Sequence, residues 1–327
     1  MLSPMIDVEF TTVVNGDIEI EVATLGSGPL VVFVHGWPEL WYSWRHQMTH
    51  LAGRGFRAAA MNVRGYGGSS NPTEVERYTM REITGDVAAV VDALGNGEPA
   101  IVIGHDWGAP IAWNTARLHP DRVRAVMGMS VPYLPIGPTS SLEIFRQLYA
   151  DKFFYQLYFQ QPGVAEAELG ADHGRSLRMI YHGASGAAAG SAGLSGDKPA
   201  DAKLLDGMVD PGLPLAHLTA EELDVYVAAY ERSGWHGPIN RYRAQDLDAA
   251  DIGHLDDDGV LTQPAAFVGG ELDGVRHFIP GLDLFDLAPR SCGDWRGTTI
   301  VPGAGHWVQQ EQPDATNAAI DDFLDSL

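Results

Sequence analysis

Residues 101–109, which read I-V-I-G-H-D-W-G-A, limit the possible folds of this chain more than any other segment. The first three residues predict a short buried strand, and the apolar spacing that follows predicts a helix. Asp106 stands at the bend between them, with Gly104 and Gly108 two positions before and after it. A turn this tight needs small flanking residues. The spacing is that of a nucleophile elbow, G-x-S-x-G, with a carboxylate in place of serine.

Asp106 could also be only the N-cap of the helix, because aspartate is a favoured N-cap residue. A nucleophile needs a base, so a suitably placed histidine argues for the catalytic alternative. His306 lies in G-A-G-H-W, directly after the last predicted strand, where a parallel sheet presents its loops. The other histidines lack that placement, although a buried structural histidine remains the alternative for His306. His105 adjoins Asp106, but adjacent residues on an elbow point apart.

The base in turn needs a carboxylate that orients it. Asp273 follows the predicted strand at 265–269 in the segment G-E-L-D-G. The order nucleophile, acid, histidine along the chain is that of the α/β-hydrolase arrangement. Glu271 and Asp294 compete with Asp273 for this role, and the pattern favours Asp273.

Strands and helices alternate over the first 131 residues, which predicts a mostly parallel sheet with helices on both faces. The first two strands, joined by Asn15-Gly16-Asp17, predict a hairpin. The predicted strands are 8–14, 18–23, 30–34, 58–63, 101–103 and 123–130, and the predicted helices include 40–52 and 79–94.

The pattern changes at residue 132, where three prolines within seven residues begin a segment without clear strand signals. We expect helices near 142–160 and 221–232, with a flexible loop rich in Gly, Ala and Ser at 183–196. Strand patterns return at 265–269 and 298–301, and a helix closes the chain at 313–327. The simplest organisation is a core of residues 1–131 and 255–327 with a helical insertion at 132–254.

Charge and composition exclude several classes of partner. The chain has 43 acidic and 21 basic residues and a formal charge of −22, which argues against nucleic acids and anionic membrane surfaces. The single cysteine, Cys292, excludes an intrachain disulfide and any multi-cysteine metal site. No apolar run has the length of a membrane span, and the first residues lack a secretory pattern. A cytoplasmic location is the expectation.

The segment His35-Gly36-Trp37-Pro38 follows a predicted central strand. In the arrangement above, the N–H of the residue after the nucleophile is one oxyanion donor, here Trp107. The second donor comes from the loop after the third strand, which makes Trp37 the candidate. An ordinary turn is the alternative, and Pro38 is a candidate for a cis peptide bond.

Across nearly its whole length the chain resembles the epoxide hydrolases of the α/β-hydrolase fold. The resemblance is carried by H-G-W-P at 35–38, W-R-H-Q at 44–47, R-G-Y-G-G-S-S at 64–70, G-H-D-W-G-A at 104–109, F-F-Y-Q-L-Y-F-Q-Q-P-G-V-A-E-A-E-L at 153–169 and G-A-G-H-W at 303–307. It implies a mostly parallel eight-stranded sheet with an inserted helical cap.

The resemblance also implies that two cap tyrosines hold the epoxide oxygen, and the motifs single out Tyr155 and Tyr242. From the residues alone, Tyr149 or Tyr158 would serve equally well. The other substrate contacts that the resemblance implies are Gln156, Trp37 and Trp107.

The implied reaction is the addition of water to a small-molecule epoxide, giving a vicinal diol through an alkyl ester on Asp106. His306 and Asp273 would drive the hydrolysis of that ester, without a cofactor or a metal, in a monomer or a homodimer. A haloalkane or haloacid dehalogenase is the nearest alternative, although haloalkane dehalogenases typically carry Asn where this chain has Trp37. A non-catalytic binding protein of the same fold is the other alternative. An esterase is disfavoured because the elbow lacks serine.

Overall fold

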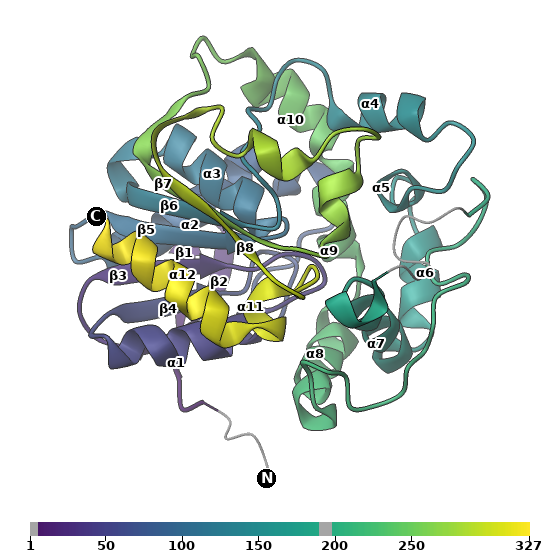
Figure 1. Cartoon of the computed structure of the whole chain (residues 1–327), viewed down its shortest axis with the longest axis horizontal. Coiled ribbons are helices and arrows are strands. Elements are labelled where there is room, and N and C mark those ends of the chain that lie inside the picture. The colour runs from purple at the N-terminus through teal and green to yellow at the C-terminus, as the bar shows by residue number, and fades with distance from the viewer. Residues whose placement is uncertain (1–5, 190–197) are drawn as a thin grey trace.

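A computed structural model of the chain describes residues 6–189 and 198–327. Its described strands form one sheet of eight strands in the order β1-β2-β4-β3-β5-β6-β7-β8 (Figure 1). The strands are β1 Glu9–Asn15, β2 Ile18–Gly26, β3 Leu30–Val34, β4 Arg57–Met61, β5 Ala100–His105, β6 Val123–Met129, β7 Leu261–Gly270 and β8 Cys292–Val301. The α/β fold with a mostly parallel sheet is therefore confirmed, because all neighbours from β4 onward pair in parallel.

The antiparallel part of the sheet is the N-terminal hairpin and its junction with β4. Strands β1 and β2 pair from Glu9↔Thr24 to Asn15↔Ile18, which confirms the predicted hairpin. Gly16 in its turn has φ 64°, a left-handed conformation that glycine adopts without strain. Strand β2 then pairs antiparallel with β4.

Helices cover both faces of the sheet, as the alternation of strands and helices predicts. Helices α1 Arg45–Gly53 and α12 Pro313–Asp325 pack on one face against the side chains of residues such as Val31 and Phe33. Helices α2 Met80–Leu94 and α3 Gly108–Leu118 pack on the other, against Val32 and Val34. Because side chains alternate along a strand, the continuous apolar run of β3 supplies both cores.

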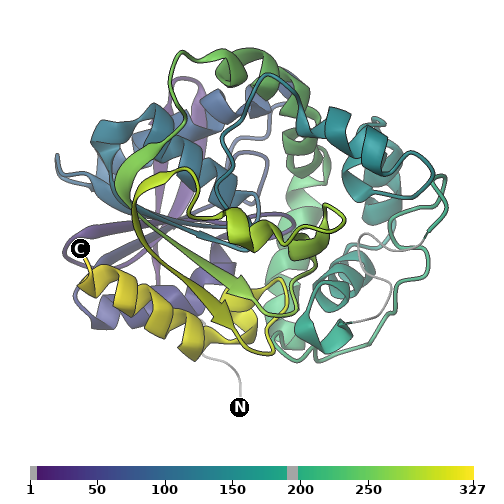
Figure 2. The same ribbon diagram turned by 45° about the horizontal axis from the view of Figure 1, so that its top comes forward.

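Only helices and loops lie between β6 and β7 among the described residues, apart from one isolated bridge between Lys152 and Pro199. The helices are α4 Ser141–Leu148, α5 Tyr155–Tyr158, α6 Val164–Gly170, α7 His173–Gly183, α8 Ala220–Ser233, α9 His236–Arg243 and α10 Gln245–Asp251. Most of these helices lie beside the sheet, on the right in Figures 1 and 2, whereas α10 lies at the top of Figure 1 between α3 and α4. The C-terminal segment also contains the short α11 Val308–Glu311.

Two helix predictions and one loop prediction differ from the structure in detail. The helix expected at 40–52 begins with a 3-10 turn, Trp41–Trp44, before α1. The helix expected near 142–160 is broken into α4 and α5, because the Phe153 N–H bonds to the Lys198 carbonyl instead of continuing a helix. The loop expected at 183–196 contains a 3-10 turn at Gly186–Ala188, and its remainder from residue 190 lies outside the described residues.

We find no helix, within residues 6–189 and 198–327, that has the length and apolar character needed to cross a bilayer.

Candidate active site

The turn between β5 and α3 holds Asp106 in a strained conformation. Asp106 has φ 50°, a region that residues with a β-carbon rarely occupy. Its carbonyl accepts a hydrogen bond from the Ala109 N–H at 3.0 Å, which closes the turn. A β-carbon on Gly104 would overlap the carbonyl of Gly108, and one on Gly108 would overlap the carbonyl of Val34. The two glycines are therefore a steric requirement of this elbow.

The carboxylate of Asp106 is buried and lies between two groups of the core. Oδ1 accepts a hydrogen bond from the backbone N–H of Trp37 at 2.8 Å. Oδ2 lies 3.3 Å from Nε2 of His306. A β-carbon on Gly36 would overlap the Asp106 side chain, so the approach of these two segments depends on glycine. The Trp107 N–H, the other expected oxyanion donor, makes no hydrogen bond to the carboxylate among the described residues.

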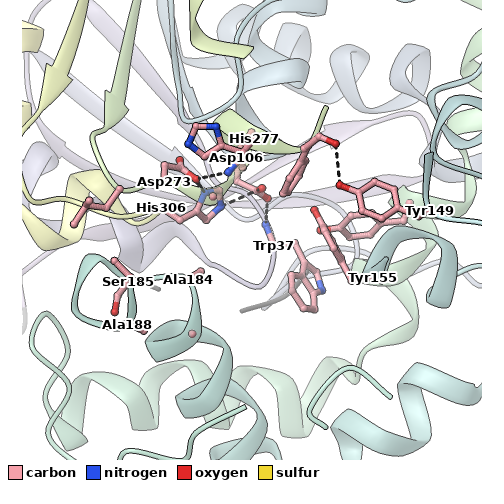
Figure 3. A pocket seen from close by; sticks show the side chains of 17 residues that line it. Trp37, Asp106, Tyr149, Tyr155, Ala184, Ser185, Ala188, Asp273, His277 and His306 are labelled. Atoms are coloured by element: carbon pink, nitrogen blue, oxygen red, sulfur yellow. Dashed lines mark hydrogen bonds and ion pairs between the residues drawn. The ribbon is translucent and has the colours of Figure 1, made fainter. Parts of the chain in front are cut away.

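Asp273 contacts the imidazole of His306 on the side opposite Asp106 (Figure 3). His306 Nδ1 lies 3.2 Å from both carboxylate oxygens of Asp273. Asp273 is only 1% exposed, and its Oδ1 also accepts the Val275 N–H at 2.9 Å. The structure thus brings together the three residues of the expected triad.

The two competing carboxylates are engaged elsewhere. Glu271 accepts a hydrogen bond from the Gly303 N–H at 3.0 Å. Asp294 forms an ion pair with Arg296 at 2.7 Å. Neither is an ion-pair partner of His306, whose partners among the described residues are Asp273 and Asp106.

The two carboxylates around His306 determine its charge. Burial opposes a charged imidazole, but the negative charges of Asp273 and Asp106 outweigh burial and hold the pKa of His306 well above its usual range. Burial likewise opposes the charge on Asp273, but His306 lowers the pKa of that carboxyl. In the resting state the imidazole is therefore a cation between two carboxylates.

A cavity of about 310 Å³ opens above the elbow (Figure 3). The triad lines it together with Trp37, and the phenols of Tyr155 and Tyr242 form part of its wall. The rings of the two tyrosines are 5.7 Å apart and nearly perpendicular. Burial raises the pKa of both hydroxyls, and the Asp106 carboxylate adds to this effect. Both phenols therefore keep their protons and can act as donors.

The two tyrosines that the residues alone left as alternatives have occupied hydroxyls. Tyr149 lines the same cavity, but its hydroxyl donates to the Phe278 carbonyl at 2.8 Å (Figure 3). The Tyr158 hydroxyl donates to Glu168 at 2.8 Å. These hydrogen bonds distinguish Tyr149 and Tyr158 from the pair formed by Tyr155 and Tyr242.

The other two expected substrate contacts, Gln156 and Trp107, are not among the described residues that line the first cavity. The Gln156 side-chain amide donates to the Tyr155 hydroxyl at 3.1 Å. Trp107 lines a second cavity of about 270 Å³. The Trp107 ring packs between Tyr242, 5.3 Å away, and the guanidinium of Arg241, 4.7 Å away.

The turn that supplies the Trp37 N–H is fixed from below by His35. Burial lowers the pKa of His35 to about 4, so its imidazole is neutral. Nδ1 lies 2.8 Å from the Gly36 carbonyl, and Nε2 accepts the Val63 N–H at 3.0 Å. The peptide bond between Trp37 and Pro38 is cis. These contacts aim the Trp37 N–H at Asp106.

Sequence reasoning missed a buried polar pair beneath the site. The Nδ1 atom of His105 lies 2.7 Å from Glu39, and its Nε2 lies 2.7 Å from the His306 carbonyl. Burial opposes the charge on Glu39, but His105 outweighs it and the pKa falls to about 2. The two nitrogens of His105 thus connect Glu39 to the backbone of His306. The signal in the sequence was the carboxylate that directly follows Pro38. The structure buries this residue, Glu39, completely.

Comparisons with known proteins agree with this geometry. The family model described as the α/β hydrolase fold matches residues 29–313. Epoxide hydrolase A of Mycobacterium tuberculosis is 39% identical over 96% of each chain, and epoxide hydrolase 1 of Siraitia grosvenorii is 35% identical over 97% of this chain and 98% of its own. The crystal structure of epoxide hydrolase A from Mycobacterium thermoresistibile superimposes with a TM-score of 0.88 and 40% identity, over 98% of this chain and 99% of its own. An epoxide hydrolase from an endophytic Streptomyces superimposes with a TM-score of 0.90 and 40% identity, over 98% of this chain and 96% of its own.

Proposed function

Because the chain belongs to the α/β-hydrolase fold family and, within it, to the epoxide hydrolases, we propose that it opens epoxides with Asp106 as the nucleophile. The observation that carries this proposal is the placement of Asp106. A strained elbow holds its carboxylate in a cavity that also contains a hydrogen-bonded His306–Asp273 pair and two protonated phenols. Residues 1–131 and 255–327 form the core in this proposal, and residues 132–254 form a cap that supplies the phenols.

In the first half-reaction, an oxygen of Asp106 attacks an epoxide carbon from the side opposite the breaking C–O bond. The new bond is an alkyl ester, and the breaking bond leaves an alkoxide on the neighbouring carbon. Tyr155 or Tyr242 gives this alkoxide a proton and becomes a phenolate, which later regains a proton from solvent. The high pKa of both phenols supports this role, because it keeps them protonated until a strong base forms beside them.

In the second half-reaction, His306 takes a proton from water, and the resulting hydroxide attacks the ester carbonyl. The oxyanion that forms on the Asp106 carboxyl lies beside the Trp37 N–H, which already bonds to Oδ1 at 2.8 Å. Collapse of this intermediate breaks the ester bond, and the imidazolium returns its proton to the departing diol. Asp106 is regenerated as a carboxylate.

The charge of His306 links the two steps. In the resting state, Asp106 and Asp273 both raise the pKa of the imidazole. Formation of the ester removes the negative charge of Asp106, so the pKa of His306 falls when a base is needed. The imidazolium then releases its proton to solvent, which leaves a neutral His306 to act as the base, and it regains a proton from solvent after the diol departs. The nucleophile therefore keeps the base protonated until alkylation is complete.

The substrate class that we propose is a small, largely apolar epoxide. Much of the cavity wall beyond the triad and the phenols is apolar, and it includes Leu272, Val275, Phe278, Ala184 and Ala188. Such a wall favours hydrocarbon substituents. We propose that the protein turns over aryl and alkyl epoxides that fit the cavity of about 310 Å³. Turnover rates across a panel of such epoxides, with long-chain fatty-acid epoxides included, test this proposal.

A single turnover in water enriched with heavy oxygen tests the proposed nucleophile. Because water attacks the ester carbonyl, the label of the first turnover should enter Asp106 and not the diol. Peptide mass spectrometry after one turnover measures this. Label that goes directly into the diol would mean direct attack by water and would exclude Asp106 as the nucleophile.

His306→Gln tests the second step separately. The variant should still alkylate Asp106 but should not release the product, so intact-protein mass spectrometry should show a stable adduct. An unmodified mass, under conditions in which the parent turns over the same epoxide, would exclude a role for His306 confined to ester hydrolysis.

A further inference from the structure

We propose that Arg243 and Gln160 are positioning residues that set the separation of the Tyr155 and Tyr242 hydroxyls. This inference rests on the proposed function, in which both phenols act on one epoxide oxygen. The two tyrosines belong to different helices, α5 and α9, that are about 80 residues apart in the chain. Something in the fold must therefore hold these helices in a fixed relation.

Arg243 directly follows Tyr242 and reaches from α9 to the segment that carries Tyr155. Its Nε donates to the Phe159 carbonyl at 2.9 Å, and its Nη2 donates to the Gln161 carbonyl at 3.2 Å. Both carbonyls lie just beyond the C-terminal end of α5. The planar guanidinium suits this task, because it fixes several acceptors in one geometry.

The same guanidinium is held by an ion pair. Its Nη1 donates to Glu166 on α6 at 2.7 Å and to Asn240, one turn earlier on α9, at 3.0 Å. The Arg243 and Glu166 side chains are only 9% and 19% exposed, so solvent screens this pair little. Arg243 thus ties α9 to the end of α5 and to α6 through three hydrogen bonds, and a fourth holds it to α9 itself.

Gln160 makes the reciprocal connection, from the Tyr155 segment to Tyr242. Its Nε2 donates to the Gln156 carbonyl at 2.8 Å and to the Tyr242 carbonyl at 3.2 Å. The first acceptor adjoins Tyr155, and the second belongs to Tyr242 itself. One amide group therefore bridges the backbone of Gln156, which follows Tyr155, and the backbone of Tyr242.

Helix α9 also has a polar attachment to the core. Arg241 bonds to the Tyr78 carbonyl and to Asp248, and it stacks on Trp107 beside the nucleophile. This anchor fixes Tyr242 relative to Asp106. The Tyr155 ring packs against Trp37 and Phe278 of the core. Among the described residues, the hydrogen bonds from a side chain to the backbone that join the two tyrosine segments are those of Arg243 and Gln160.

The mechanism makes this separation matter. Two phenols that act on the same oxygen must both point at one place in the cavity, and a misplacement of about 1 Å can cost on the order of 100-fold in rate. Only the alkylation step uses the phenols as donors. We call the hydrogen bonds of Arg243 and Gln160 between the two tyrosine segments the clamp. Loss of the clamp should therefore slow ester formation and leave ester hydrolysis, which depends on His306, unchanged.

The experiment compares the two half-reactions in Arg243→Lys and Gln160→Leu by stopped-flow single turnover. Each variant should slow alkylation by roughly 10- to 100-fold, with ester hydrolysis within about twofold of the parent. Arg178→Lys is the matched control, because Arg178 also pairs with a carboxylate outside the core, Asp210 at 2.5 Å, but does not touch either tyrosine segment. It should leave both steps unchanged.

The decisive measurement repeats Gln160→Leu and Arg243→Lys in a Tyr155→Phe background. With one phenol left, the separation of two hydroxyls no longer matters, so the clamp substitutions should slow alkylation by no more than about twofold. An undiminished effect in that background, or equal slowing of both half-reactions, would overturn the clamp. Parent-rate alkylation by the Tyr155→Phe/Tyr242→Phe protein would instead overturn the proposed function of the tyrosines.

Discussion

The core and the helical segment hold their parts of the site by different physical means. In the core, Asp106 is placed by backbone sterics, because Gly36, Gly104 and Gly108 leave no room for a β-carbon. In the helical segment, Tyr155 and Tyr242 are placed by hydrogen bonds from side chains to distant backbone carbonyls. Steric placement is local and rigid, whereas placement by long side chains depends on residues far apart in the chain.

The two halves should therefore tolerate substitutions differently. A backbone conformation such as φ 50° at Asp106 persists only where its surroundings enforce it, so an added methyl group must disrupt the whole turn. Each substitution of Arg243 or Gln160 removes only some of the hydrogen bonds between the tyrosine segments. It changes the separation of the two phenols without removing a reacting group. We therefore expect large, all-or-none effects in the core and graded effects in the helical segment.

Asp106→Ala should produce the largest effect, because it removes the group that forms the ester. Turnover should fall on the order of 10⁶-fold, as for the loss of a nucleophile in other covalent enzymes, while circular dichroism and thermal unfolding should remain close to the parent. Residual turnover within about 100-fold of the parent would place the core nucleophile elsewhere.

Tyr155→Phe and Tyr242→Phe test the graded behaviour of the helical segment. Each single substitution should slow ring opening partially, since the other phenol still donates. The double substitution should slow it by about 100- to 10,000-fold, as for the loss of a general acid. The measurement is the pre-steady-state rate of ester formation on an epoxide beside a haloalkane of similar size, whose halide leaves without a proton. Efficient halide release by the parent without epoxide turnover would favour a dehalogenase.

Gly108→Ala tests whether the core half is fixed by sterics. The new methyl group would collide with the Val34 carbonyl, and overpacking of this kind typically costs about 1–3 kcal/mol of stability. The thermal midpoint should fall and activity should fall with it. Gly53→Ala is the matched control, because that glycine ends α1 with no atom within 4 Å of the new group. A Gly108→Ala protein as stable and active as the control would show that the elbow is not sterically fixed.

The smallest expected effect is the pH dependence of stability that results from the charge on His306. The folded-state pKa of His306 is raised above its unfolded value of about 6.5. Its contribution to stability is therefore fully present below pH ~6.5 and is lost as the pH rises through the folded-state pKa. Thermal unfolding of the parent and His306→Gln between pH 5 and 10 measures this. The parent's advantage should be largest at low pH, and a constant difference would contradict a charged resting imidazole.

Ester hydrolysis should have its own pH dependence, because it needs neutral His306. Its single-turnover rate should fall up to about tenfold per pH unit below the pKa of His306 in the alkylated protein. That pKa should lie below the one seen in resting-state unfolding, since the ester has removed the charge of Asp106.

The same difference between the halves explains what could be predicted from the sequence. The elbow at Asp106 and the hairpin around Gly16 follow from local spacing and from the conformations that glycine allows, so both were predicted. The helices α6, α7, α9 and α10 were not. In α9, Asn240 and Arg241 are buried with polar contacts, so its buried face carries no apolar period.

The tyrosines show the same limit within the site. Tyr149, Tyr155 and Tyr158 have equal claims in the sequence, and only the resemblance to a known family separated them. In the structure, the Phe278 carbonyl and Glu168 occupy the hydroxyls of Tyr149 and Tyr158. Such contacts join residues up to 129 positions apart, which no local pattern encodes. The buried pair of Glu39 and His105 was missed for the same reason.

The pairing of β6 with β7 has a consequence for recombination. The two strands are neighbours, in register from Val126↔Ala265 to Met129↔Val268, although more than 130 residues separate them in the chain. Because the two strands are parallel, the intervening segment leaves the sheet at the carboxyl end of β6 and re-enters it at the amino end of the neighbouring strand β7. A chimaera that exchanges this segment for one from a relative keeps every strand in register, because both crossover points lie at the ends of paired strands. Gene exchange at these two points would replace the part of the cavity wall that the segment supplies, including both phenols, while Asp106, Asp273 and His306 stay unchanged.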